Sequence, residues 1–174
     1  MKQFNDITII GIDQGYGNMK TANTIFPTAI TAYDTAPMFK GDVLEYGGKF
    51  YRVGEGHKGF VADKSTDGDF YLLTLAAIAK ELDYRGAERT AKVLLAPGLP
   101  LTSFGRDKKS FRSYLYRDGS AIPFRYEGQD YTITIQEVSL FPQGYAAVLT
   151  QTELLDEPSV IVADIGGWTV DLMR

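Results

Sequence analysis

The sequence has no cysteine and a single histidine, His57, among its 174 residues. Disulfide bridges, thiolate metal sites and histidine-rich metal centres are therefore excluded. Basic side chains are also few: 18 Lys and Arg stand against 22 Asp and Glu, and no basic run is longer than Lys108 and Lys109. A nonspecific nucleic-acid surface needs a denser basic patch, so we expect no direct contact with DNA.

Long hydrophobic runs are missing as well. No stretch approaches the ~20 apolar residues of a membrane-spanning helix, and the first residues lead into a short apolar run without the hydrophobic segment of a signal peptide. We therefore expect a cytoplasmic protein with no membrane contact. What is present, 44% hydrophobic, 13% aromatic and 23% charged residues, is the composition of a globular domain that folds without disulfides or metal.

The first part of the chain favours β-structure. A continuous apolar run predicts a buried strand that enters a glycine-rich turn, and alternating segments follow it. The expected strands of this part are 7–12, 18–23, 25–31, 43–46 and 49–53. Gly47 and Gly48 separate the last two strands and predict a two-residue hairpin turn.

Helical patterns then alternate with strand patterns. Apolar residues recur at helical spacing over 68–84, and Thr66 or Asp67 is suited to cap that helix. Two more helices are expected at 106–116 and 143–154, and strands at 93–96, 122–126, 131–138 and 160–163, the last of them fully buried. Pro97 and Gly98 are expected to stop the first of these strands.

One arrangement occurs twice, at 7–22 and at 160–173. In each case an apolar strand ends in an aspartate, a glycine turn follows, and a second strand leaves the turn. A single loop of this kind is explained as well by an ordinary hairpin, in which Asp and Gly satisfy the turn geometry. Two such loops, separated by an α/β layer, predict two related sites that face one ligand.

The first loop has the groups that a magnesium-bound triphosphate requires, because backbone amides bind phosphate oxygens and carboxylates hold a hydrated cation. Gly15 and Gly17 let the backbone approach the phosphates, and Lys20 adds a compact positive charge. Asp13 is expected near the metal. The second loop offers the same kinds of group in Asp164, Gly166, Gly167 and Thr169.

Three segments resemble motifs of the actin superfamily. Residues 11–20, GIDQGYGNMK, resemble its phosphate-1 motif, and residues 164–171, DIGGWTVD, resemble phosphate-2. Between them, residues 138–144, VSLFPQG, are similar to the first connecting segment. The sequence looks most like the plasmid-segregation actins of the ParM and StbA group, since the segment at 99–101, the helix at 106–115 and the strand at 131–141 also follow in that group's order and spacing.

This resemblance implies a protein that binds ATP with Mg²⁺, polymerises into filaments and hydrolyses the ATP. It implies that Asp13 and Asp164 hold the metal through water. Gln143 would orient the attacking water, and Lys20 would contact the phosphates. The nucleotide-contacting residues that it implies are Asp13, Gly15, Tyr16, Gly17, Asn18, Lys20, Asp164, Gly166, Gly167, Trp168 and Thr169. Trp168 stands where many relatives have a small or hydroxyl residue, and we expect it to serve in packing.

The implied fold class is α/β. It is domain I of an actin-like, ribonuclease H-like ATPase, with a mixed five-stranded sheet, flanking helices and a small β-rich subdomain. We expect this domain over 1–158, with the subdomain inserted at about 32–65. Residues 159–174 are expected to open a truncated domain II. ATP hydrolysis is expected of the full-length protein, and the fragment alone is expected to be inactive.

The implied partners are further copies of the protein in a filament and an adaptor protein bound to centromere-like DNA. The implied role is the segregation of plasmid or phage DNA. Two other interpretations stay open. One is an actin-fold scaffold that assembles without hydrolysis, and the other is a relative of sugar kinases or heat-shock chaperones that shares the phosphate loops.

Overall fold

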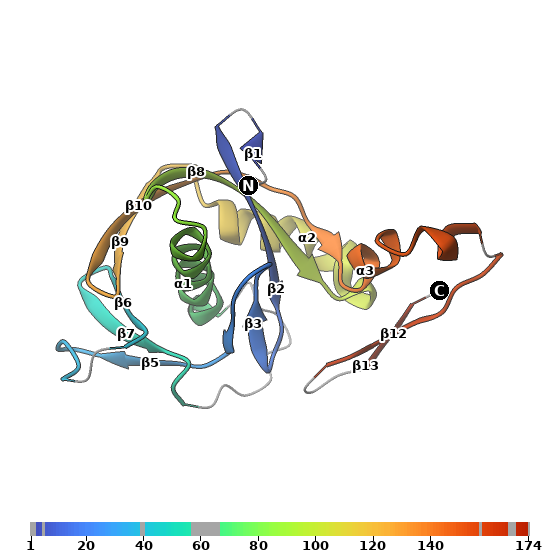
Figure 1. The fold of residues 1–174 in the computed structure, drawn as a ribbon. Coiled ribbons are helices and arrows are strands. Elements are labelled where there is room, and N and C mark those ends of the chain that lie inside the picture. Colours follow the sequence, from blue (N-terminus) through green and yellow to red (C-terminus); the bar gives the residue numbers. More distant parts are fainter. Residues whose placement is uncertain are drawn as a thin grey trace.

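The structure is a computed structural model that describes residues 3–4, 6–38, 41–56, 67–156, 158–166 and 170–173. Its main feature is a curved sheet that wraps around one central helix, α1, as Figure 1 shows. Within the described residues, eleven strands belong to this sheet, and β12 and β13 form a two-stranded sheet of their own. That hairpin lies apart from the curved sheet, near the C-terminal end (Figure 1).

Five strands form the centre of the curved sheet, in the order β4-β3-β2-β8-β10. β2, β8 and β10 run parallel, whereas β3 is antiparallel to both β2 and β4. Their bounds are Ile7–Gln14 for β2, Asn18–Lys20 for β3, Ile25–Pro27 for β4, Thr90–Leu99 for β8 and Gln129–Val138 for β10. The mixed sheet expected from the sequence is thereby confirmed, but it continues beyond the five strands that were expected. The short strand β1 (Gln3–Phe4) pairs with β2.

Four strands extend the sheet beyond β10. β9 pairs antiparallel with β10, and β6, β7 and β5 follow in that order. Their bounds are Ile30–Tyr33 for β5, Val43–Tyr46 for β6, Lys49–Val53 for β7 and Ala121–Tyr126 for β9. The strands β5, β6 and β7 form the β-rich segment. This segment is continuous with the main sheet because β6 pairs with β9 at two positions, Leu44 with Tyr126 and Glu45 with Arg125.

The predicted hairpin turn between β6 and β7 is confirmed. Gly47 and Gly48 have φ angles of 59° and 76°, a left-handed conformation at both central positions that glycine adopts without steric cost. The strand predicted over 25–31 is instead two strands, β4 and β5. The chain leaves β4 after Pro27 because the following residues turn back to bond the loop after β2, as described below.

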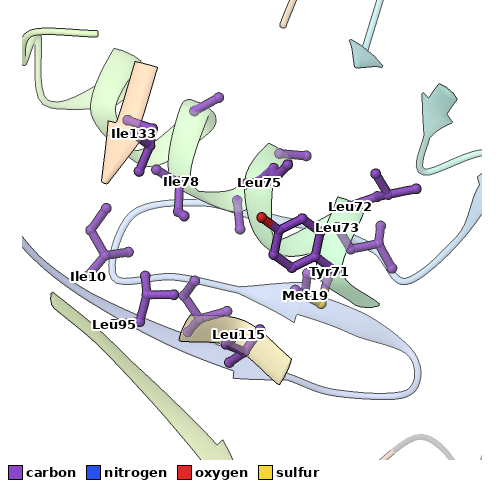
Figure 2. Close-up of a cluster of buried hydrophobic side chains, with 14 of the residues drawn as sticks. Ile10, Met19, Tyr71, Leu72, Leu73, Leu75, Ile78, Leu95, Leu115 and Ile133 are labelled. Carbon is purple, nitrogen blue, oxygen red and sulfur yellow. The ribbon is translucent and has the colours of Figure 1, made fainter. Parts of the chain in front are cut away.

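Helix α1 (Gly68–Tyr84) is the centre of the core, and the predicted helix is confirmed. Asp67 caps it by accepting a hydrogen bond from the Asp69 backbone N–H at 2.9 Å. Every residue from 71 to 79 is buried, so the helix has no solvent-facing stripe in this stretch. Figure 2 shows Leu75 and Ile78 on the side of the helix toward the sheet residues Ile10 and Leu95.

Helix α2 (Leu101–Tyr116) follows β8 directly and packs Phe111 and Leu115 into the same core. The sequence pattern predicted this helix from 106, but it begins right after Pro100, its N-cap residue. After β11 (Phe141–Pro142) the predicted helix over 143–154 is shorter and divided. It consists of α3 (Tyr145–Leu149) and a 3-10 helix, Thr152–Asp156.

Two strand predictions are wrong in informative ways. β8 does not stop at Pro97 and Gly98, because neighbouring strands continue beside it: β2 pairs Ile12 with Pro97, and β11 pairs with Gly98. The strand predicted as buried over 160–163 is β12 (Val162–Ile165), paired with β13 (Val170–Met173). Ile165 is 78% exposed. In the described residues β12 pairs only with β13, and Ile161, which lies within the predicted strand, is 72% exposed.

A cluster around Asp42 joins the β-rich segment to α1. The Asp42 carboxylate accepts a hydrogen bond from the Tyr126 hydroxyl at 2.5 Å and pairs with the Lys80 ammonium. Lys80 also lies over the rings of Phe26 and Tyr126, 5.4 and 5.5 Å from their centres. Burial raises the pKa of Asp42, but the bonds from Lys80 and Tyr126 outweigh it and leave that pKa below its ordinary value.

A second cluster joins the end of α1 to the strands β2 and β3. The Glu81 carboxylate, whose side chain is 0% exposed, accepts hydrogen bonds from Thr21 Oγ1 at 2.5 Å, Asn23 Nδ2 at 2.7 Å and Arg85 Nε at 2.7 Å. Arg85 also donates to the Ile9 carbonyl at 3.0 Å. The turn after β3 is therefore tied to α1 through a fully bonded buried charge.

We predict that Glu81→Gln destabilises the fold by about 3 kcal/mol near neutral pH, because it leaves Arg85 without its buried counter-charge. Burial raises the pKa of Glu81, but its hydrogen bonds bring that pKa below the ordinary 4.5. The stabilising effect is therefore complete above pH 4.5 and is lost as the pH falls through the lower pKa of the folded state. Urea unfolding of both proteins over a pH series measures this difference.

The matched control is Glu45→Gln, which removes an exposed ion pair with Arg125 at 3.4 Å. We expect it to change the free energy of unfolding by less than ~1 kcal/mol at every pH. Equal stability of Glu81→Gln and the wild type near neutral pH contradicts the prediction.

Candidate functional site

The glycine turn between β2 and β3 is tightly constrained. β2 ends at Gln14 and β3 begins at Asn18, with Asp13 opposite Lys20 in the hairpin. A Cβ on Gly15 would lie 2.7 Å from the Asn18 carbonyl oxygen, which is closer than real Cβ atoms approach another heavy atom. Gly15 is therefore required for this turn to form.

Thr28 holds the same turn from the opposite side. Its hydroxyl donates to the Gly15 carbonyl at 2.6 Å, and its backbone N–H donates to the Gly17 carbonyl at 3.0 Å. The Thr28 side chain is buried, and the Tyr16 ring packs edge-on against Phe70 of α1 with ring centres 6.3 Å apart. The turn is thus shaped before any ligand binds.

The end of β2 is anchored to α1 on its inner face. The buried Gln14 side chain donates from Nε2 to Thr74 Oγ1 at 2.7 Å, and that hydroxyl donates in turn to the Phe70 carbonyl at 2.7 Å. Because successive strand residues point to opposite faces, this bond directs Asp13 to the outer face of the sheet.

Three residues proposed from the sequence meet on that outer face. Lys20 Nζ lies 3.1 Å from Asp13 Oδ2, and Gln143 Nε2 donates to Asp13 Oδ1 at 3.2 Å. Lys20 and Asp13 keep 51% and 42% of their side-chain surface exposed, so a ligand from solution has access to them. The backbone N–H of Gln143 also donates to the Leu99 carbonyl at 2.8 Å, which ties its segment to β8.

The second loop is described only in part. Asp164 lies on β12, opposite Asp171 of β13, and Gly166 follows the strand. Among the residues that the structure describes, Asp164 makes no hydrogen bond or ion pair with the first-loop residues, and no three acidic, histidine or cysteine side chains gather as a metal site. The other residues proposed for this loop, Gly167, Trp168 and Thr169, lie outside the described residues, as does His57.

The assembled groups have complementary chemistry. An ammonium binds phosphate oxygens, a carboxylate binds a hydrated divalent cation, and a side-chain amide orients a water molecule. The sequence pointed to these three groups but not to Thr28 and Thr74, whose hydrogen bonds hold the turn and the end of β2, nor to Gly98, which leaves room for the Gln143 side chain. No local pattern marks Thr28 or Thr74, whereas Gly98 was noticed only as a strand terminator.

In the described part of the chain, none of the helices has both the length and the apolar character needed to span a membrane.

The solved structures most relevant to this fold are actin homologues. An archaeal actin homologue has a TM-score of 0.73 at 20% identity, covering 95% of this chain and 56% of its own. The AlfA filament bound to AMPPNP has a TM-score of 0.69 at 19% identity, with 95% and 64% covered. A ParM filament from Clostridium botulinum has a TM-score of 0.71 at 19% identity, with 96% and 58% covered. At these identities the likeness shows the fold, and the chain spans less than two thirds of each relative.

Sequence comparison agrees with the fold. No curated protein matches the sequence. The family described as the N-terminal domain of actin-like proteins matches residues 11–145, which include the glycine turn, Lys20 and Gln143. The chain therefore belongs to the actin-like protein family and carries its N-terminal domain, in a ParM-type fold.

Proposed function

We propose that this chain is the nucleotide-binding half of a filament-forming actin-like ATPase. The observation that carries the proposal is the meeting of Asp13, Lys20 and Gln143 beside a glycine turn that Thr28 holds in shape. A cation, a carboxylate and an amide at one accessible turn are what ATP hydrolysis with Mg²⁺ needs, and a pure scaffold has no use for them.

The first-loop residues fit a magnesium-bound triphosphate. The turn at Gly15 presents backbone with no side chain in the way, and Lys20 supplies positive charge for the phosphates. Asp13, and Asp164 from the second loop, would hold the metal through its water ligands. When bound, the metal neutralises charge on the phosphates. The remaining proposed nucleotide contacts come from both loops and are Tyr16, Gly17, Asn18, Gly166, Gly167, Trp168 and Thr169.

Gln143 is proposed to orient the attacking water. Its Nε2 donates to Asp13, so its Oε1 is the atom that remains to accept a hydrogen bond from water. An amide is a poor base, but hydrolysis of a phosphoanhydride depends mainly on positioning and charge neutralisation. Domain I is proposed to span 1–158, with domain II opening over 159–174, and the nucleotide is proposed to lie between the halves.

The relatives support the wider proposal. An archaeal homologue was solved with ADP, AlfA as a filament with AMPPNP, and ParM as a filament. We infer that this protein assembles with its own copies in the cytoplasm and contacts DNA through an adaptor, in the segregation of plasmid or phage DNA. Because the chain covers about half to two thirds of these relatives, hydrolysis is expected of the full-length protein and not of this segment alone.

The first prediction concerns binding. Calorimetry of the full-length protein with Mg-ATP should show binding that Asp164→Ala abolishes, and Lys20→Ala should weaken it about tenfold or more, the scale for one charged hydrogen bond. Lys49→Ala, at an exposed position of the β6–β7 hairpin, is the control and should leave the affinity unchanged. Absence of binding by the wild type would mean that the actin fold is retained as a scaffold.

The second prediction concerns Thr28. Thr28→Val keeps the shape of the side chain and the backbone bond to Gly17 but removes the hydroxyl bond to Gly15. We expect a roughly two- to tenfold weaker affinity for Mg-ATP, matching the loss of one neutral hydrogen bond. Thr28→Ser retains the hydroxyl and should bind more tightly than Thr28→Val. The same affinity for all three proteins argues against a role for this bond.

The third prediction separates an ATPase from a scaffold that assembles without hydrolysis. Gln143→Ala should slow ATP hydrolysis by roughly 100-fold, the scale for one preorganised transition-state interaction. Sedimentation and negative-stain microscopy should still show filaments in the presence of ATP. Hydrolysis as fast as in the wild type contradicts this role of Gln143, whereas a wild type that forms filaments without measurable hydrolysis favours the scaffold.

A further inference from the structure

Asp13 and Gln143 reach one another across an intervening strand. β2, which carries Asp13, pairs with one edge of β8, and β11, which precedes Gln143, pairs with the other edge. The last pair of β2 with β8 is Ile12 with Pro97, and the first pair of β11 with β8 is Phe141 with Gly98. The Gln143 side chain must therefore pass over β8 at Gly98 to donate to the Asp13 carboxylate.

Gly98 leaves the space that this crossing occupies. A Cβ built on Gly98 would lie 2.9 Å from Gln143 Cγ and 3.9 Å from its Cα and Cδ. Contact at 2.9 Å is shorter than real Cβ atoms show, so one of the two groups would have to move. The Gln143 backbone is held by its hydrogen bond to Leu99, and its side chain is therefore the part displaced.

Successive residues of β8 face opposite sides of the sheet, and this alternation places the space at Gly98 on the outer face, where Asp13 and Gln143 meet. Pro97 and Leu99 on either side of Gly98 point into the core and are buried. The Cβ position of Gly98 therefore faces the opposite, outer side of the sheet, toward Gln143. The φ angle of Gly98 is outside the left-handed region, so its backbone conformation is open to any residue. The need for glycine here comes from the Gln143 side chain.

We propose that Gly98 is a positioning residue for Gln143. With no side chain at position 98, Gln143 lies across β8 and Asp13 fixes its amide through the bond from Nε2 at 3.2 Å. That bond sets which end of the amide faces outward, since the NH₂ group is turned to the carboxylate and Oε1 away from it. Asp13 therefore orients Gln143 in addition to its proposed part in holding the metal.

Gly98→Ala tests this directly, because the three heavy atoms nearest to the added carbon all belong to Gln143. In the full-length protein we expect an affinity for Mg-ATP within about twofold of the wild type and single-turnover hydrolysis slowed roughly 10- to 100-fold, the scale for a misplaced reacting group. The rate comparison rests on the proposed function. Gly105→Ala is the matched control, because apart from the backbone of α2 itself no described residue lies within 4 Å of the added carbon, and it should hydrolyse ATP at the wild-type rate.

The double variant Gly98→Ala/Gln143→Ala distinguishes positioning from a general structural role. If Gly98 acts through Gln143, the double variant hydrolyses ATP no more slowly than Gln143→Ala alone. Rate losses that multiply in the double variant would overturn the proposal, and so would a wild-type rate for Gly98→Ala.

A measurement without nucleotide keeps the two proposals separate. The side-chain amide signals of Gln143 in a ¹⁵N–¹H NMR spectrum are assigned by their loss in Gln143→Ala. They should shift in Gly98→Ala and in Asp13→Ala, and stay in place in Gly105→Ala. Unshifted signals in Gly98→Ala overturn the positioning role even if the protein binds ATP. Shifted signals in a protein that binds no nucleotide refute the proposed function and leave the positioning intact.

Discussion

The burial of α1 is the constraint on which the rest of the structure depends. Every residue from 71 to 79 is buried and the Glu81 side chain is 0% exposed, so the polar side chains in and beside this stretch need partners on the surrounding elements. Thr74 bonds the end of β2, Lys80 bonds Asp42 before β6, and Glu81 bonds the turn after β3. These three contacts radiate from one helix and fix the sheet around it at three places.

The candidate site follows from two of those contacts. The bond from Gln14 to Thr74 holds the inner face of β2, which leaves Asp13 on the outer face, and the Glu81 cluster holds the turn that follows Lys20. The ion pair at the surface is thus supported by buried bonds directly behind it. The positions of Lys20 and Asp13 are therefore set by the core, since their exposed ion pair contributes little stability itself.

The sequence predicted those parts whose signals are local. The helix over 68–84 is marked by its own apolar periodicity and by the capping residue just before it. The glycines after Asp13 likewise predict the hairpin turn. The course of β8 was not predictable in this way, because Pro97 and Gly98 are turn residues in isolation and become strand residues only between two paired neighbours. The bond from Gln143 to Asp13 joins residues 130 positions apart, so its geometry appears only once the sheet is assembled.

The continuous sheet also has a mechanical consequence. The β-rich segment is joined to β9 by backbone hydrogen bonds, and β9 to β10 and β10 to β8 in the same way. A displacement of β5 or β7 would therefore be passed through successive hydrogen-bonded strands to β8, the strand over which Gln143 lies. An intermolecular contact made by the outermost strands would therefore be connected to the proposed catalytic amide through paired strands.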